Sequence, residues 1–143
     1  MLGDCPITWT SRLQTEIALS TTEAEYIALS SGMRELLPTR SLLEEVVSKL
    51  DLKLQDGSTT VKSTVFEDNN GALSMATAPR HSPRPKHIAV KYHFFKSHIN
   101  NGSQKDTGIN IERVDTNVQK ADIFTKGLDK DKFQSLQKML MGW

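Results

Sequence analysis

The sequence offers little that would indicate a secreted, membrane-spanning or zinc-binding protein. Its 143 residues include a single cysteine, Cys5, which excludes an internal disulfide and favours a reducing compartment. No apolar run approaches the roughly 20 residues that a membrane-spanning helix needs. The first residues lack the basic start and apolar core of a signal peptide, and no cysteine and histidine set has zinc-site spacing. We therefore expect an intracellular protein with neither a disulfide partner nor a membrane partner.

The composition indicates one folded domain without a global preference for nucleic acid. Hydrophobic residues make up 37% of the chain and charged residues 24%, and the formal net charge is only +1. Any basic binding surface must therefore be local. The length suits a single compact domain over residues 1–143.

Strand-like and helical segments alternate along the chain, which predicts an α/β fold with a sheet that can be mixed. Strands are expected at residues 5–9, 61–66 and 108–114. Helices are expected from about 21 to 37, with Pro38 ending or kinking the helix, and at 41–50, 70–76, 87–100, 116–126 and 131–140. An Asn can cap the helix at 70–76, and the last helix is amphipathic. One side of the helix at 87–100 carries Ile88, Tyr92, Phe95 and Ile99.

The first expected helix begins with two glutamates two positions apart. Ser20 and Glu23 have the spacing of a capping box, in which the Glu23 carboxylate accepts from the Ser20 N–H. Glu25 instead shares a helix face with Leu29 and Leu36. A carboxylate on an apolar face requires an explanation other than helix capping.

Three acids are candidates for a shared site. Besides Glu25, Asp68 follows a strand and precedes a helix, and Asp122 falls in the second turn of a later helix. Ligand sites of open α/β sheets lie outside the carboxyl ends of the strands. Clustered carboxylates need cations, and oxygen ligands suit Mg²⁺ or Mn²⁺ rather than zinc. Alternatively, Glu25 extends its carboxylate to solvent or pairs with an arginine, Asp68 caps a helix and Asp122 interacts with a helix dipole.

A local basic strip lies between Asp68 and Asp106, where the sequence contains no acid. The strip contains Arg80, Arg84, Lys86, Lys91, Lys96 and Lys105, interleaved with Tyr92, Phe94 and Phe95. Such a strip can bind phosphates, or it can be a solvated helix face.

Four motifs together resemble the ribonuclease H domain that closes the Pol polyprotein of copia-type retrotransposons. They are "WTSRLQTEIALSTTEAEYIALS", "FEDNNGAL", "PKHIAVKYHFFK" and "VQKADIFTKGL". The resemblance covers nearly the whole chain and implies a ribonuclease H-like mixed sheet with flanking helices, of which the first two strands are missing. Residues 1–143 would then form one incomplete domain.

The resemblance implies an activity that hydrolyses the RNA strand of an RNA–DNA hybrid during reverse transcription. By motif, Glu25, Asp68 and Asp122 would be catalytic and would hold two Mg²⁺ or Mn²⁺ ions. The implied nucleic-acid contacts are Asn70, Arg84, Lys86, His87, Lys91 and Lys96. The implied partners are the hybrid and the upstream reverse transcriptase portion of the polyprotein, in the cytoplasm, the nucleus or a virus-like particle.

One family residue lies upstream of this sequence. The leading aspartate of the family's site stands on a strand before the segment that Met1 begins, so we expect the chain alone to be inactive, unless another acid such as Asp115 replaces it. The alternative is a non-catalytic retroelement remnant that at most binds nucleic acid. A related polynucleotidyl transferase such as an integrase fits the "KHI" and "ADIFTK" blocks less well.

Overall fold

The computed structural model describes residues 1–3, 5–53, 60–78, 88, 90–100 and 107–142. They form two compact units, one of residues 17–113 and one of residues 1–16 together with 114–143. Both helices and strands are present, in a mixed α/β arrangement. The expectation of one domain over residues 1–143 stays a prediction.

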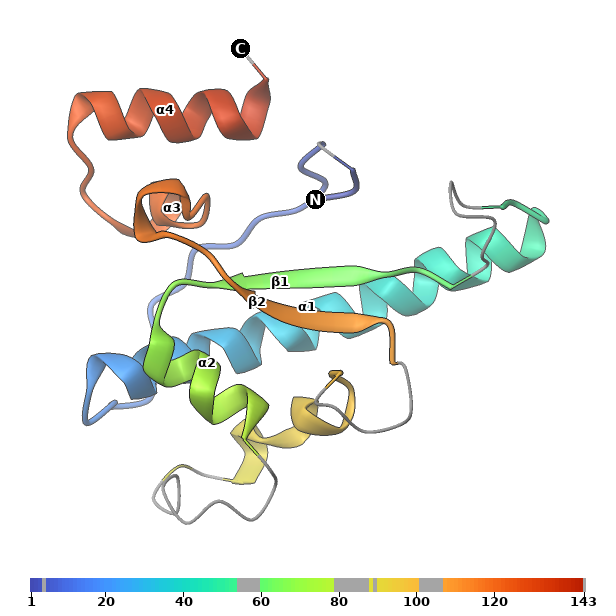
Figure 1. Ribbon diagram of the computed structural model, residues 1–143, viewed down its shortest axis with the longest axis horizontal. Helices are drawn as coiled ribbons and strands as arrows, with labels where there is room; N and C mark the ends of the chain where they lie inside the picture. The colour runs from blue at the N-terminus through green and yellow to red at the C-terminus, as the bar shows by residue number, and fades with distance from the viewer. Residues whose placement is uncertain (4, 54–59, 79–87, 89, 101–106, 143) are drawn as a thin grey trace. The chain divides into compact units, whose positions relative to one another are not determined.

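The larger unit begins with the long helix α1, Thr21–Lys49 (Figure 1). The Glu23 N–H donates to the Ser20 Oγ over 3.1 Å, so Ser20 is the N-cap that the sequence predicts. The Glu23 carboxylate accepts from the Leu19 N–H over 2.9 Å, one residue before the expected donor. Glu23 therefore serves the start of the helix, and Glu25 is left for another role.

Helix α1 continues through Pro38, so the expectation that the helix ends near this residue is wrong, whereas the expected kink stays a prediction. Pro38 is exposed. The Thr39 hydroxyl donates to the Glu35 carbonyl over 2.8 Å, which adds a hydrogen bond in the turn that the proline disturbs. Farther along, Val47 is buried, so tertiary contacts stabilise the second half. Among the described residues, no helix is both long and apolar enough to cross a membrane.

In the described part of this unit two strands form a sheet, and both confirm the sequence prediction. Strands β1, Ser63–Glu67, and β2, Ile109–Arg113, pair in parallel, with Ser63 opposite Ile109 and Glu67 opposite Arg113 (Figure 1). Helix α2, Asn70–Thr77, follows β1 and is capped by Asn69, whose side chain accepts from the Ala72 N–H over 3.0 Å. An Asn cap was expected here. Parallel pairing puts the carboxyl ends of both strands at the same edge.

The segment expected as one helix over 87–100 contains two short 3-10 helices instead. They are η1, Val90–Tyr92, and η2, Phe94–Ser97. The His93 and Lys96 N–H groups donate to carbonyls three residues back, as 3-10 geometry requires. The residues predicted to face inward are all buried: Ile88, Tyr92, Phe95 and Ile99. The hydrophobic spacing was therefore right about the buried face and wrong about the type of helix.

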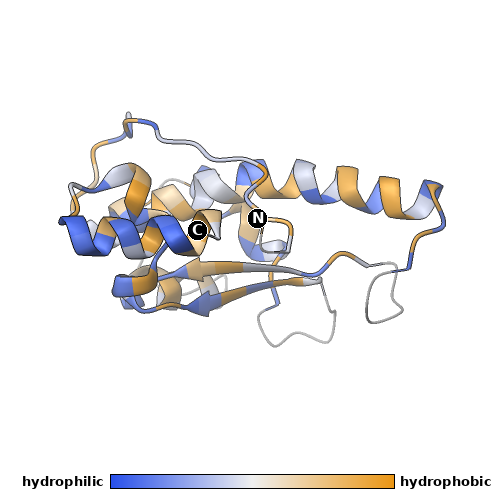
Figure 2. Cartoon of the chain, turned by 90° about the horizontal axis from the view of Figure 1, so that it is seen from above, coloured by the Kyte–Doolittle hydropathy of each residue, from blue (hydrophilic) through white to orange (hydrophobic). Residues whose placement is uncertain are grey.

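The core of the unit forms between α1, α2, the 3-10 segment and β2. Figure 2 shows hydrophobic residues recurring along α1. Tyr26 is fully buried, packs against the Phe95 ring and makes a 2.7 Å hydrogen bond between its hydroxyl and His93 Nδ1. Burial raises the pKa of the Tyr26 phenol above its ordinary value of 10.0. The inward face of α1 centres on Tyr26 and Met33, which leaves Glu25 at its margin.

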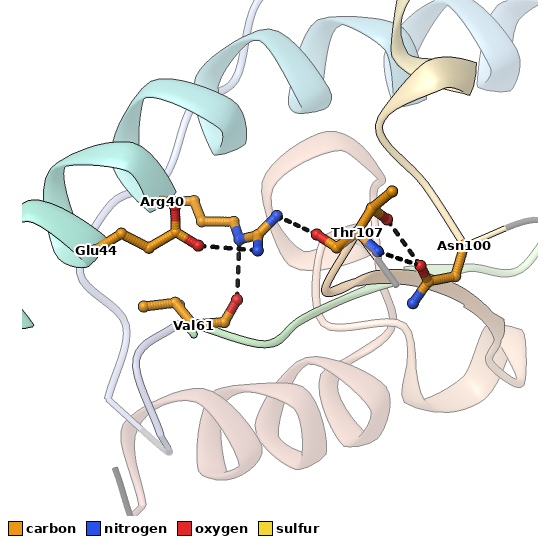
Figure 3. A network of polar contacts seen from close by, with 5 residues as sticks. All are labelled: Arg40, Glu44, Val61, Asn100 and Thr107. Atoms are coloured by element: carbon orange, nitrogen blue, oxygen red, sulfur yellow. Dashed lines mark hydrogen bonds and ion pairs between the residues drawn. The ribbon is translucent and has the colours of Figure 1, made fainter. Parts of the chain in front are cut away.

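Arg40 joins α1 to the segments that lead into both strands (Figure 3). Its guanidinium donates to the Val61 carbonyl over 2.9 Å and to the Thr107 carbonyl over 2.6 Å. Its third nitrogen pairs with Glu44 at 2.9 Å. Gly108 has a positive φ of 70°, and a Cβ there would lie 2.5 Å from the guanidinium. A glycine therefore allows Arg40 to bind both strand entrances.

The smaller unit has a less regular beginning than the sequence predicts. Residues 6–10 form no strand, because Leu2 and Cys5 close a short antiparallel bridge and no neighbouring strand pairs with the described residues that follow. The Ser11 hydroxyl donates to the Phe124 carbonyl over 2.9 Å, which ties this segment to the C-terminal part of the unit.

The helices of the smaller unit are η3, Thr116–Val118, α3, Asp122–Thr125, and α4, Lys130–Met141. The amphipathic helix at the end of the chain is confirmed: Leu136 and Leu140 are buried, and Asp129 caps its start. Asp122 begins α3 rather than lying in a second turn. The expected single helix fails because Asp115 caps η3 and the chain turns again before Asp122.

Candidate metal centre

A buried glutamate at the end of β1 anchors the candidate site. Alternation along the strand places Val65 and Glu67 on the inner face and Phe66 on the outer face, where Phe66 is 55% exposed. Glu67 is only 5% exposed. Its carboxylate accepts from the Asn69 N–H over 2.9 Å, at the start of α2. This hydrogen bond fixes the Glu67 side chain at the carboxyl edge of the sheet.

Glu25 and Asp68 lie next to this glutamate. One carboxylate oxygen from each of Glu25, Glu67 and Asp68 lies within 4.8 Å of the others. Glu25 comes from the start of α1, and Asp68 follows β1 directly; both are half-buried. The structure thus brings together two of the three acids that the sequence predicted.

A close approach of two helix starts produces this arrangement. A Cβ on Gly71, in the first turn of α2, would lie 2.7 Å from Thr22 Cγ2 and 2.8 Å from Thr22 Oγ1. Thr22 also donates weakly to the Asn69 side chain, over 3.4 Å. Only a residue without a Cβ leaves room for α1 at this distance. Because Thr22 stands less than one turn before Glu25, the contact carries Glu25 to the end of β1.

Asn70 and Arg113 stand at the same edge. Asn70 Oδ1 accepts a hydrogen bond from the Arg113 guanidinium. Arg113 ends β2 and is the register partner of Glu67. The carboxyl edge therefore carries side chains from α1, β1, α2 and β2.

The spacing and chemistry of the three carboxylates fit a hard divalent cation. Mg²⁺ binds oxygen ligands at 2.0–2.1 Å, so ligands on opposite sides of one ion are about 4.2 Å apart. At most one pair among three such ligands can lie opposite each other, and neighbouring ligands are about 3.0 Å apart. The three oxygens, which lie within 4.8 Å of one another, would therefore draw closer together around one ion. Like charges this near one another repel, and a cation between them removes the repulsion. Oxygen donors alone favour Mg²⁺ or Mn²⁺ over zinc.

Asp122 belongs to the smaller unit, 1–16 with 114–143. It is 3% exposed, and its two oxygens pair with Lys126 at 2.8 Å and with Lys132 at 3.4 Å. Its expected place beside Glu25 and Asp68 stays a prediction.

The expected nucleic-acid contacts are found in different surroundings. Lys91 is exposed, with its Nζ 4.9 Å from the centroid of the Tyr92 ring. Lys96 is only 5% exposed, and its Nζ donates to the Ala78 carbonyl over 3.4 Å. Lys96 would have to leave the interior to reach a phosphate. Arg84, Lys86 and His87 lie outside the described residues.

Sequence reasoning missed Glu67 and chose a different acid to supplement the site. Asp115, the acid considered as a replacement, caps η3 by accepting from the Asn117 N–H over 2.8 Å. The signal for Glu67 was the alternation of β1: two residues after Val65, it must share the inner face. Reading the strand as ending at residue 66 concealed this.

Comparison with known proteins places the chain among retroelement sequences. No family model and no solved structure match it. It is 33% identical over 134 residues to the Retrovirus-related Pol polyprotein from transposon RE1 of Arabidopsis thaliana, covering 94% of this chain and 8% of that protein. It is 32% identical over 136 residues to the corresponding polyprotein from transposon TNT 1-94 of Nicotiana tabacum, covering 95% and 9%. The polyprotein from transposon RE2 of Arabidopsis thaliana is 32% identical over 139 residues, covering 97% and 9%.

The chain thus spans less than a tenth of the length of these relatives, although they match nearly all of it. Its homologues are retrovirus-related Pol polyproteins of plant transposons.

Proposed function

We propose that this chain derives from a retrotransposon Pol polyprotein and contributes the ribonuclease H activity that hydrolyses the RNA strand of an RNA–DNA hybrid. The observation that carries the proposal is the meeting of Glu25, Glu67 and Asp68 at the carboxyl edge of the sheet. The names of the relatives supply the retroelement context. The partners would be the hybrid and the reverse transcriptase portion of the polyprotein, wherever in the cell or virus-like particle reverse transcription takes place.

Each residue has a definite task in this proposal. Glu25, Glu67 and Asp68 would hold divalent Mg²⁺ or Mn²⁺, and the Asn69 N–H keeps the Glu67 carboxylate in place. The bound cations would supply a water of lowered pKa and stabilisation for the leaving oxygen of an in-line displacement. Asp122 would add another carboxylate after exchanging its ion pairs with Lys126 and Lys132.

Hydrolysis of a labelled RNA–DNA hybrid tests the proposal. We expect no Mg²⁺-dependent cleavage by residues 1–143 alone, because the resemblance puts a further aspartate on an upstream strand. Joining the chain to the polyprotein segment that carries this strand should produce cleavage of the RNA strand. Glu25→Gln should then abolish it, since loss of a key catalytic group costs several orders of magnitude.

Two results would contradict the proposal or its reasoning. An extended chain that cleaves equally well with Glu25→Gln would exclude the carboxylate mechanism. Cleavage by residues 1–143 alone, lost on Asp68→Asn, would show that the upstream aspartate is not required and that Glu67 is the first acid to test in its place.

A second candidate function is nucleic-acid binding without catalysis. It is favoured by two exposed cations around one ring: the Arg34 guanidinium lies 5.9 Å and the Lys91 Nζ 4.9 Å from the Tyr92 centroid. Such a pair of exposed cations attracts phosphates. Hybrid binding that depends on Lys91, with no cleavage by the extended chain, would establish this function instead.

A further inference from the structure

Arg113 shares the inner face of the sheet with the carboxylates. Ile109 is fully buried and Ile111 is partly buried, and the two-residue period of a strand places Arg113 on the same face. Its register partner across the parallel pair is Glu67, which also faces inward. Arg113 is nevertheless exposed, since it stands at the carboxyl end of β2, where the edge is open.

The guanidinium is oriented by a neutral partner. It donates to the Asn70 side-chain oxygen, from the first turn of α2. Among the described residues it forms no ion pair with a carboxylate, although Glu67 and Glu112 are nearby in register and sequence. Its charge is therefore not neutralised there, and most of its five N–H donors remain available.

We infer that Arg113 is a phosphate-binding residue for the nucleic-acid strand that lies over Glu25, Glu67 and Asp68. This inference rests on the proposed function, which brings a polyanion to that edge. A strand phosphate approaching three carboxylates meets repulsion, and a fixed cation beside them offsets part of it without any metal. A planar guanidinium suits phosphate oxygens, which it can bind through two parallel hydrogen bonds.

Asn70 acts through this arginine as a positioning residue. Its amide oxygen is taken by Arg113, so the contact that the sequence assigned to Asn70 is made in part by the guanidinium it holds. A side chain held in one orientation loses less conformational entropy on binding a phosphate.

Binding of a fluorescent RNA–DNA hybrid to the 143-residue chain tests the inference, measured by anisotropy over a range of salt concentrations. We expect Arg113→Ala to weaken binding about tenfold, the effect of losing a charged hydrogen bond. The salt slope should fall by about 1. Arg113→Lys should keep the slope and lose part of the affinity, since it keeps the charge without the planar fork.

Lys49→Ala is the matched control. It removes one exposed cation at the far end of α1, where its pair with Glu45 is solvated, and should leave the hybrid affinity unchanged. Asn70→Ala should weaken binding less than Arg113→Ala and add little to it in the double variant, because the two residues act as one unit. Unchanged thermal unfolding of Arg113→Ala would exclude a merely structural cause.

The outcomes separate this inference from the proposed function. Hybrid affinity and salt slope that are the same in Arg113→Ala and Lys49→Ala would overturn the inference, whether or not the carboxylates bind metal. Weaker hybrid binding by the Arg113→Ala chain than by the Lys49→Ala chain would support the inference. Failure of the extended chain to cleave would then count against the proposed catalysis alone, because the phosphate contact is measured without cleavage.

Discussion

At the scale of single residues, Lys96 is unusual for a lysine because its side chain is buried. An ammonium is costly to bury, yet Lys96 is 5% exposed and has only the Ala78 carbonyl, at 3.4 Å, as its hydrogen-bond acceptor among the described residues. Burial lowers its pKa below the ordinary value of 10.5. The folded protein therefore favours the neutral amine more than the unfolded chain does.

This difference predicts a stability that rises with pH. Between the lowered pKa of the folded state and 10.5, the unfolded chain binds more protons at this lysine, so the free energy of unfolding increases with pH. Lys96→Met keeps the apolar stem and removes the titrating group. Urea unfolding over the alkaline range should show a shallower rise for Lys96→Met than for the original chain. Lys91→Met, at an exposed position, is the control; a slope equal in all three chains would contradict the prediction.

The sequence predicted only some of the acids that lie together in the candidate site. Glu25 and Asp68 were found because each occupies a position that helix or strand geometry does not explain. Glu67 was missed because its membership depends on where β1 ends. When the strand continues through residue 67 instead of ending at residue 66, the two-residue alternation places the Glu67 side chain on the inner face.

At the scale of the elements, Gly71 determines how near α1 comes to α2. Alanine is the better helix former by about 0.8–1.0 kcal/mol, which alone would stabilise α2. The added Cβ would however lie 2.7 Å from Thr22 Cγ2, so one of the helices must shift. Overpacking of this kind typically costs about 1–3 kcal/mol.

We predict that Gly71→Ala weakens Mn²⁺ binding at the carboxylates by moving Glu25 away from Glu67. Thr22→Ala removes the atoms that clash and should restore the affinity when combined with Gly71→Ala. Mn²⁺ is titrated into the original chain, the two single variants and the double variant. The four affinities show whether the effect of Gly71→Ala depends on the Thr22 side chain. Equal affinities in the original chain and in Gly71→Ala would show that the helix contact does not position Glu25.

The elements themselves were predicted well where local signals act alone. The strand pattern found β1 and β2, an asparagine cap found the start of α2, and amphipathic spacing found α4. Predictions failed where tertiary contacts decide. Contacts of Arg40 and Val47 hold α1 together beyond Pro38, and the segment 5–9 lacks a described strand to pair with.

At the scale of the whole molecule, alternating strands and helices correctly indicated an α/β protein, and the structure adds that the strands β1 and β2 pair in parallel. The division into two units left no trace in the sequence, because the smaller unit joins both ends of the chain. Among the described residues the parallel sheet has two strands, whereas parallel sheets are normally covered on both faces and have more strands. The ribonuclease H-like order of strands therefore stays a prediction.

The central claim is that Glu25, Glu67 and Asp68 form one divalent-cation site, and titration with Mn²⁺ followed by electron paramagnetic resonance tests it most directly. We predict saturable binding that Glu67→Gln weakens at least about tenfold, because the amide removes a charged ligand while it can still accept from the Asn69 N–H. Glu112→Gln is the matched control, since Glu112 is an exposed acid on the outer face of β2. Equal Mn²⁺ affinity in Glu67→Gln and Glu112→Gln would contradict the claim.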